Sequence, residues 1–273
     1  MDDMDPRPIG VFDSGLGGLT TVRELCRLLP EEDIVYFGDT GRVPYGSRSR
    51  ETIVKYARQD VAFLRTFDLK AIVIACGTVS TTALDVLAAE NPIPVLGVVA
   101  PAARAAARAT RSGSIGLIGT QASIRSGAYE RLIRAENPAA RVLAQPCPLF
   151  VPLVENGRFR PGDVVIETVA AEYLAPLKEA GVDTLVLGCT HYPLLEKVIG
   201  AYMGPEVRLI NSGAEGARAA ADCLRERDAL AGPGRGSCRC FVSDRQEDFS
   251  RLASTFLGWD VAQAVEQVDI SQY

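Results

Sequence analysis

The sequence predicts an α/β fold of two similar domains, each built on a parallel sheet, related by a pseudo-twofold axis. Short apolar runs rich in β-branched residues alternate along the chain with longer segments whose apolar residues recur at helical spacing. Apolar strands separated by helices are typical of parallel βαβ units covered on both faces. The length of 273 residues accommodates two domains of roughly 100–150 residues.

The predicted elements follow one another in chain order. Eight apolar runs are predicted to be strands: Ile9–Phe12, Ile34–Gly38, Ala71–Ala75, Val95–Val99, Ser114–Ile118, Arg141–Ala144, Thr184–Leu187 and Val207–Ile210. Helical spacing is clearest in four segments: Leu19–Leu29, Glu51–Phe67, Thr81–Glu90 and Ile124–Ala135. A further helix is predicted to begin in Ala102–Ala109. The Gly- and Arg-rich segment Ala231–Cys240 is predicted to be a surface loop, followed by a strand-like Phe241–Ser243 and a helix over Gln246–Leu257.

The chain also resembles itself. The strand motif Ile9-Gly-Val-Phe12 recurs 106 residues later as Ile115-Gly-Leu-Ile118, and a Gly-bearing polar turn follows both copies. A second pair lies 113 residues apart, where a strand runs into Cys76 or Cys189, a Thr follows within two residues and a helix is expected. Two motif pairs at nearly the same offset predict two related halves. A boundary near Val99–Pro101 would separate them.

Composition and charge exclude several classes of protein. With 29 basic and 34 acidic residues the net charge is −5, and no basic stripe indicates a nucleic-acid partner. No apolar run reaches the roughly 18 residues of a membrane span, and the acidic first ten residues lack the apolar segment of a signal peptide. Seven cysteines without a compact spacing framework are expected to be reduced thiols, which favours a cytoplasmic protein.

The Gly-rich turn Asp13-Ser-Gly-Leu-Gly-Gly18 is not a nucleotide-binding motif. A dinucleotide fingerprint starting at Gly15 would need Gly where the chain has Thr20, and a phosphate-binding P-loop would need a nearby Lys. The glycines are expected to allow a tight turn whose backbone N–H groups and Ser14 hydroxyl face an anion. A plain strand-to-helix turn is the alternative.

Two cysteines carry the strongest chemical signal. Cys76 and Cys189 each lie between the end of a predicted strand and the start of a helix, where the helix N-terminus lowers a thiol pKa from its usual value of about 8.5. If the halves face each other, the two thiols approach one cleft from opposite sides. One could then remove a proton from carbon while the other delivers a proton to the opposite face, as in racemisation or epimerisation. The alternative is two unrelated core thiols.

The remaining signals concern protons and cofactors. His191 is the single His of the chain, and its place two residues after Cys189 suits a group that tunes or shuttles the proton of that thiol. One His nearly excludes a His-based metal site, and Cys238-Arg-Cys240 would need distant ligands, so no metal is expected. Of the four Lys, none is a good candidate for a Schiff base with pyridoxal phosphate. A cofactor-free proton transfer is therefore expected.

Six motifs together resemble the glutamate racemases, cofactor-independent enzymes of the aspartate/glutamate racemase superfamily. The resemblance covers nearly the whole chain in order, and the Gly-Cys-Thr-His-Tyr-Pro block is its most specific part. The motifs are Asp13-Ser-Gly-Leu-Gly-Gly-Leu19, Gly38-Asp-Thr-Gly-Arg-Val-Pro-Tyr-Gly46 with Ser47-Arg48, Val151-Pro-Leu-Val-Glu155, Leu187-Gly-Cys-Thr-His-Tyr-Pro193, Asn211-Ser-Gly213 and Phe241-Val-Ser-Asp244.

The resemblance implies a role for each matched residue. Cys76 and Cys189 match the two catalytic thiols, Asp13 the carboxylate that assists the first thiol, and Glu155 and His191 the groups that assist the second. Substrate contacts are implied for Asp13, Ser14, Tyr45, Gly46, Thr78, Thr190 and His191. The implied fold places the active site between two α/β domains, the first comprising residues 1–99 and 212–273 and the second residues 100–211.

Gly77 departs from the pattern. Most glutamate racemases have Asn directly after the first catalytic Cys, and the amide of that Asn helps to hold the amino acid. Gly77 offers at most its backbone N–H to the substrate. The Gly77→Asn substitution is therefore expected to lower the KM for glutamate if the pocket has room for the amide.

The implied function is the interconversion of L- and D-glutamate, with D-glutamate supplied for peptidoglycan synthesis. Glutamate is then the small-molecule partner, and neither nucleic acid nor membrane is expected as one. The oligomeric state stays open, a homodimer included. Three alternatives remain: an aspartate racemase or one of broader specificity, an amino-acid binding protein derived from a racemase, and a thiol redox protein.

Overall fold

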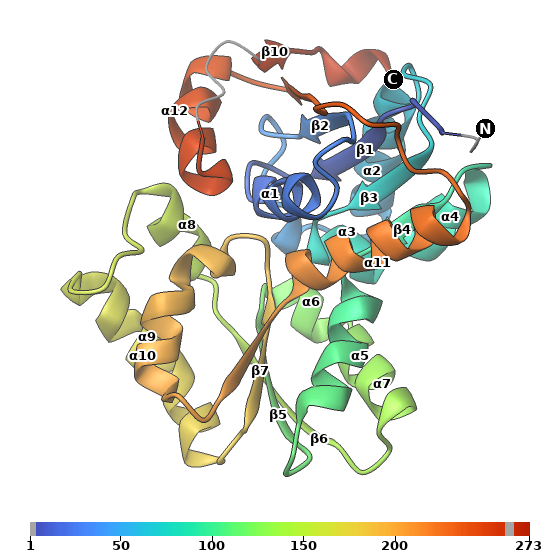
Figure 1. The fold of residues 1–273 in the computed structure, drawn as a ribbon. Helices are drawn as coiled ribbons and strands as arrows, with labels where there is room; N and C mark the ends of the chain where they lie inside the picture. Colours follow the sequence, from blue (N-terminus) through green and yellow to red (C-terminus); the bar gives the residue numbers. More distant parts are fainter. Residues whose placement is uncertain (1–3, 260–264) are drawn as a thin grey trace.

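The structure is a computed structural model that describes residues 4–259 and 265–273, and it forms two lobes (Figure 1). The first lobe contains a parallel sheet of six strands in the order β10-β9-β2-β1-β3-β4, built from both ends of the described chain. In that order the strands are Val265–Gln267, Cys238–Val242, Ile34–Gly38, Ile9–Asp13, Ala71–Ile74 and Val95–Gly97.

Helices cover both faces of this sheet because its strands are apolar on both sides. Alternate residues of β1 enter different cores: Ile9 and Val11 pack towards α1 and α12, while Phe12 packs towards α2. The helices of this lobe are α1 (Leu19–Leu28), α2 (Arg50–Leu64), α3 (Gly77–Thr82), α4 (Leu84–Glu90) and α12 (Gln246–Leu257), with short 3-10 turns η1 (Tyr45–Ser47) and η3 (Ile270–Gln272).

The second lobe contains a parallel sheet of four strands in the order β6-β5-β7-β8. In that order the strands are Arg141–Pro146, Ser114–Gly119, Thr184–Gly188 and Arg208–Asn211. Helices α5 and α7 pack on one face, and α9 packs on the other. The helical elements are α5 (Val99–Ala109), α6 (Gln121–Arg125), α7 (Ala128–Glu136), α8 (Phe150–Glu155), α9 (Val164–Glu179), η2 (Tyr192–Leu195) and α10 (Glu196–Met203).

The strand orders confirm the predicted internal symmetry. The order β2-β1-β3-β4 of the first sheet repeats as β6-β5-β7-β8 in the second. The strands that carry the repeated motifs, β1 with β5 and β3 with β7, therefore occupy equivalent positions. Because the strands of each sheet are parallel, their carboxyl ends meet at one edge, and ligands of open α/β sheets bind at such edges.

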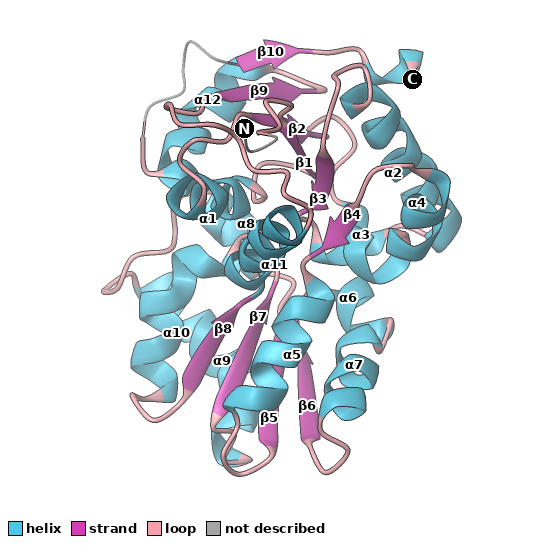
Figure 2. Ribbon diagram, turned by 45° about the vertical axis from the view of Figure 1, so that its right-hand side comes forward, coloured by secondary structure: helices cyan, strands magenta, loops and turns pink. Residues whose placement is uncertain are grey.

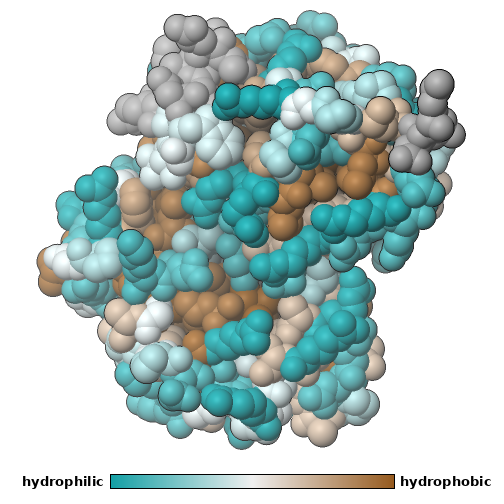
Figure 3. All heavy atoms as spheres, viewed as in Figure 1, coloured by the Kyte–Doolittle hydropathy of each residue, from teal (hydrophilic) through white to brown (hydrophobic). Residues whose placement is uncertain are grey.

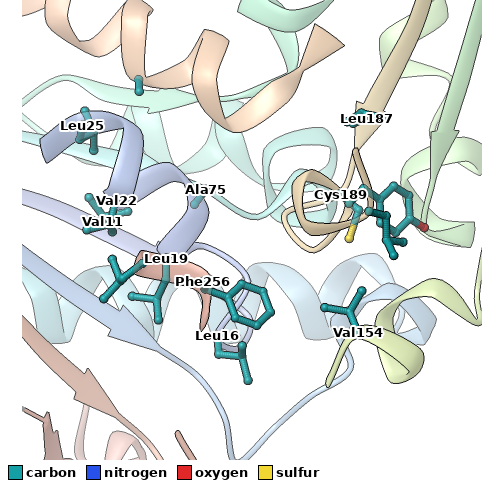
Figure 4. Close-up of a cluster of buried hydrophobic side chains, with 14 of the residues drawn as sticks. Val11, Leu16, Leu19, Val22, Leu25, Ala75, Val154, Leu187, Cys189 and Phe256 are labelled. Atoms are coloured by element: carbon teal, nitrogen blue, oxygen red, sulfur yellow. The ribbon is translucent and has the colours of Figure 1, made fainter. Parts of the chain in front are cut away.

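One of the clusters of buried apolar residues spans both lobes. A single cluster of buried residues contains Val11 and Leu19 of the first lobe together with Leu187 of the second, and Phe256 of α12 belongs to it as well. Figure 4 shows Phe256 and Leu16 between the side chains of the first lobe and Cys189 of the second. Helix α11 (Ser212–Glu226) runs between the lobes and packs against both α1 and α5 (Figure 2).

The surface is ordinary for a folded domain. Hydrophilic side chains cover most of the face drawn in Figure 3, and hydrophobic residues gather mainly towards its middle. Within the described ranges, no helix combines the length and apolar character that crossing a bilayer requires.

The structure corrects several predicted boundaries. The helix expected over Thr81–Glu90 is divided into α3 and α4, and the one expected over Ile124–Ala135 is divided into α6 and α7 at Gly127, which adopts a left-handed conformation with φ of 62°. The loop prediction for Ala231–Cys240 is wrong at its end, because Cys238–Cys240 pairs with β2 as part of β9. Strand β10 had no counterpart in the prediction.

Candidate active site

A cavity of about 410 Å³ lies between the lobes, at the carboxyl ends of β1, β3, β5 and β7. Ten of the eleven site residues predicted from the sequence line it. They are Ser14, Tyr45, Gly46, Cys76, Gly77, Thr78, Glu155, Cys189, Thr190 and His191. Residues up to 177 positions apart, Ser14 and His191, thus meet in one space because the two lobes present the same sheet edge to each other.

Cys76 lies two residues after the end of β3, directly before α3, and is buried at the cavity wall. Its thiol donates a hydrogen bond to Ser14 Oγ at 3.4 Å. Burial and the negative charge of Asp13 raise the pKa of Cys76 to about 12. The expectation of a lowered pKa is therefore wrong for this thiol, since α3 is a helix of only six residues and its dipole is outweighed by burial.

Cys189 lies directly after β7 and faces a charged partner. His191 Nδ1 is 3.9 Å from Cys189 Sγ, and His191 Nε2 donates to Glu155 Oε1 at 3.0 Å. Burial alone would lower the pKa of His191, but the hydrogen bonds to Cys189 and Glu155 outweigh it and raise the pKa to about 10. A protonated His191 places a positive charge next to the Cys189 sulfur. The α-helix expected after this motif is replaced by the 3-10 turn η2.

Asp13 is the predicted site residue that does not line the cavity. Its carboxylate is buried at the end of β1, where Oδ2 accepts a hydrogen bond from the Gly15 backbone at 3.1 Å and Oδ1 has no partner in the structure. Burial raises the pKa of Asp13, although the charge of His191 and nearby backbone N–H groups act against this rise. A direct contact of Asp13 with substrate stays a prediction.

The Gly-rich turn brings the lobes into close contact. A Cβ added at Gly17 would lie 2.5 Å from His191 Nδ1, and it would also meet the Thr190 side chain. Thr20 Oγ1 at the start of α1 donates to the Thr190 backbone oxygen at 2.9 Å. Gly17 is therefore required by the close approach of Thr190 and His191, whereas an anion at this turn stays a prediction.

Gly77 occupies an equally tight place. A Cβ added there would lie 2.8 Å from the backbone oxygen of Gly188, the last residue of β7 in the other lobe. The expected room for an Asn amide is thus absent in this conformation. Replacing Gly77 would require a backbone shift between the lobes. A lower KM for glutamate is therefore no longer expected for Gly77→Asn.

Tyr45 lines the cavity, but its hydroxyl is engaged by other side chains of the protein. Its ring is buried, and its hydroxyl donates to Asp39 Oδ2 while also lying 3.0 Å from Asp60 Oδ2. The hydroxyl is therefore engaged below the cavity wall. The turn η1 can offer a ligand the edge of the Tyr45 ring and the backbone of Tyr45 and Gly46.

Comparison with known proteins adds a sequence and a structural relationship. The sequence model of the Asp/Glu/Hydantoin racemase family matches residues 12–220. The chain belongs to this family. A glutamate racemase from Geobacter metallireducens is 49% identical to it over 253 residues, which are 92% of this chain and 93% of the relative.

Solved structures of the racemase family share the fold. A glutamate racemase from Francisella tularensis in complex with D-glutamate superimposes with a TM-score of 0.91 at 38% identity, covering 99% of this chain and 100% of the other. An isoform of glutamate racemase from Bacillus anthracis also gives a TM-score of 0.91 at 38% identity and covers 98% of each chain.

Sequence reasoning missed part of this racemase-family cavity. Thr120, Gln121 and Cys147 line it without a predicted role, and so do Val151 and Pro152 of the Val151–Glu155 motif. Thr120 Oγ1 lies 3.1 Å from Thr78 Oγ1 and so joins the two lobes. The internal repeat contained the signal for Thr120, because the offset of 106 residues between the first motif pair places it opposite Ser14.

Among the described residues that line the cavity, none is Lys or Arg. The buried Lys70 is paired with Glu32 at 2.5 Å. Anionic groups of a ligand must therefore be met by hydroxyls, backbone N–H groups and His191. In the described parts of the chain no three His, Cys, Asp or Glu side chains are arranged to hold a metal ion.

His191 should titrate near pH 10 in the folded protein. Its pKa lies above the usual 6.5, so its protonation stabilises the fold fully below about pH 6.5, and this contribution is lost as the pH rises to about 10. Because the chain has one His, NMR of an untagged sample reports this group alone. Glu155→Gln should lower the midpoint, since it removes one charged partner. A midpoint at or below 6.5 in the unmodified protein would contradict the ion pair.

Proposed function

We propose that this protein is a cofactor-independent glutamate racemase that interconverts L- and D-glutamate through two thiols. The observation that carries the proposal is the pair Cys76 and Cys189, which follow equivalent strands of two related lobes and line one cavity. The named activity of its family relatives and the D-glutamate bound in one of them support the same substrate.

The chemistry needs one base and one acid on opposite faces of the substrate Cα. In one direction the Cys189 thiolate removes the Cα proton, and the Cys76 thiol delivers its own proton to the other face. The products are the enantiomer, a Cys189 thiol and a Cys76 thiolate. The reverse direction exchanges these roles. The raised pKa of Cys76 and the imidazolium beside Cys189 support a resting state with one thiol and one thiolate.

The neighbouring groups support this exchange of protons. His191, held by Glu155, stabilises negative charge on Cys189, while buried Asp13 and the Ser14 hydroxyl surround Cys76. The hydroxyls of Ser14, Thr78 and Thr190 and the backbone at Tyr45, Gly46 and Gly77 are the proposed substrate contacts. A carbanion at Cα would be stabilised by such fixed dipoles in a closed site.

The proposal extends to the setting of the reaction. D-glutamate produced here would supply peptidoglycan synthesis, and the catalytic thiols require a reducing compartment such as the cytoplasm. All seven cysteines are free in the structure, in keeping with that setting. We also propose the division into residues 1–99 with 212–273 and residues 100–211. A homodimer stays an expectation.

Purified protein without added cofactor should convert L-glutamate to D-glutamate under reducing conditions. Circular dichroism at one wavelength follows the decay of the L-glutamate signal as the racemate forms, and L-aspartate serves as the parallel substrate. Faster turnover of aspartate would assign the chain to the alternative specificity. Binding of glutamate without turnover would indicate a binding protein, and a reversible Cys76–Cys189 disulfide in mass spectrometry would indicate a redox protein.

A further inference from the structure

Below the cavity wall lies a buried charged network that the proposed chemistry does not use. Asp39 follows β2, Asp60 lies on α2, and both carboxylates are fully buried. Arg42 and Tyr45 complete the network, which reaches Ser243 after β9. Tyr45 is also the one buried side chain of the segment 43–47 that lines the cavity.

The hydrogen bonds of the two carboxylates differ. Asp39 only accepts: Oδ1 from Ser243 Oγ at 2.7 Å, and Oδ2 from both Arg42 Nε at 2.6 Å and the Tyr45 hydroxyl. Asp60 Oδ1 accepts from Arg42 Nη2 at 2.8 Å, whereas Asp60 Oδ2 faces the Tyr45 hydroxyl oxygen at 3.0 Å.

The number of available protons determines which group donates in each of these hydrogen bonds. The Tyr45 hydroxyl has one proton, and donating it to Asp39 leaves none for Asp60. Asp60 Oδ2 then needs a proton of its own to make a hydrogen bond with the phenol oxygen. The charge points the same way, because one guanidinium balances one carboxylate, and a second unpaired carboxylate in this buried place would be costly.

We propose that Asp60 is held in its protonated form and that the chain Asp60–Tyr45–Asp39 positions segment 43–47 of the cavity wall for substrate binding. The inference rests on the proposed function for its kinetic readout. Burial and the charge of Asp39 raise the pKa of Asp60 well above its ordinary value, with Asp13 acting with them and Arg42 and the Tyr45 hydroxyl against them. This direction agrees with the proton count.

Isosteric Asp→Asn substitutions are expected to have different effects at the two carboxylates of the network. In Asp60→Asn the amide N–H₂ replaces the carboxyl O–H as donor to Tyr45, and the amide oxygen still accepts from Arg42. In Asp39→Asn the amide nitrogen replaces an oxygen that accepts, so an N–H group meets Ser243 or meets Arg42 and Tyr45. One change preserves every hydrogen bond, whereas the other reverses or breaks at least one and removes the negative charge that pairs with Arg42.

The test compares KM and kcat for glutamate in these two variants. Asp60→Asn should keep both constants within about threefold, whereas Asp39→Asn should raise KM about tenfold or more with a smaller change in kcat. Asp60→Ala should raise KM like Asp39→Asn. The matched control is Asp68→Asn, on an exposed carboxylate outside the network. Equal damage from the two Asn variants, or an unchanged KM in Asp39→Asn, would overturn the proposal.

A second measurement does not depend on activity. Infrared difference spectra between the unmodified protein and Asp60→Asn should contain the carbonyl stretch of one protonated carboxylic acid, and its absence would overturn the inference. If this band is present but the unmodified protein does not racemise glutamate, the proposed function fails while the protonation of Asp60 stands. If Asp39→Asn does not fold, Ser243→Ala, which removes one donor from Asp39, takes its place in the kinetic comparison.

Discussion

Cys76→Ser and Cys189→Ser are each expected to abolish racemisation, with kcat lowered by about 10³-fold or more. A serine hydroxyl is too weakly acidic to replace a thiol in either role, and the proposed mechanism assigns one thiol to each face of Cα. The remaining thiol can still remove and return a proton on its own side. Exchange of the Cα hydrogen with deuterium from D₂O is therefore expected to persist from one enantiomer in each variant.

Two measurements check this result. Circular dichroism follows racemisation, and NMR in D₂O follows loss of the Cα proton from L- and D-glutamate separately. Cys223→Ser, which changes a free thiol of α11 outside the cavity, is the matched control and should keep its activity. Racemisation near the unmodified rate in either active-site variant would eliminate the two-base mechanism.

Gly77→Asn is expected to reduce kcat/KM by about tenfold or more, because its Cβ would lie 2.8 Å from the Gly188 backbone oxygen. Overpacking of this kind costs roughly 1–3 kcal/mol, and each 1.4 kcal/mol corresponds to about tenfold. The shift would fall between the lobes, on the residue that precedes Cys189. The spacing of the two thiols would therefore change.

Gly77→Ala separates the two parts of this substitution, since it adds the Cβ without the amide. A similar loss in both variants would assign the effect to the contact with Gly188. Gly234→Ala is the control, because nothing lies within 4 Å of a Cβ added there. An increase in kcat/KM for Gly77→Asn would mean that the lobes separate easily enough to admit the amide.

The sequence predicted the sheets well because their signal is local. Apolar, β-branched runs mark strands wherever both faces are covered. The two motif pairs also predicted that β1 is equivalent to β5 and β3 to β7, as the strand orders show. It failed at β10, which has only three residues, and at Cys238–Cys240, where a Gly- and Arg-rich composition concealed a strand paired with β2.

The sequence predicted ten residues that line the cavity, but it did not predict their electrostatics. A strand end before a helix start is visible in the sequence at Cys76, whereas the depth of burial and the nearby Asp13 that raise its pKa are tertiary properties. The same holds for Gly77, whose restriction comes from the backbone of the other lobe. Nothing near Tyr45 in the sequence indicates that its hydroxyl meets Asp60, fifteen residues away.

The apolar cluster shared by the lobes limits how this molecule can move. Leu187 of the second lobe and Phe256 of the first belong to the same buried cluster. A wide hinge motion would expose that surface at roughly 25 cal/mol per Å², so opening by a few hundred Å² would cost about 5–10 kcal/mol. Ligand exchange must therefore proceed through small displacements at the rim. We therefore expect the two lobes to unfold together, because they share this buried cluster.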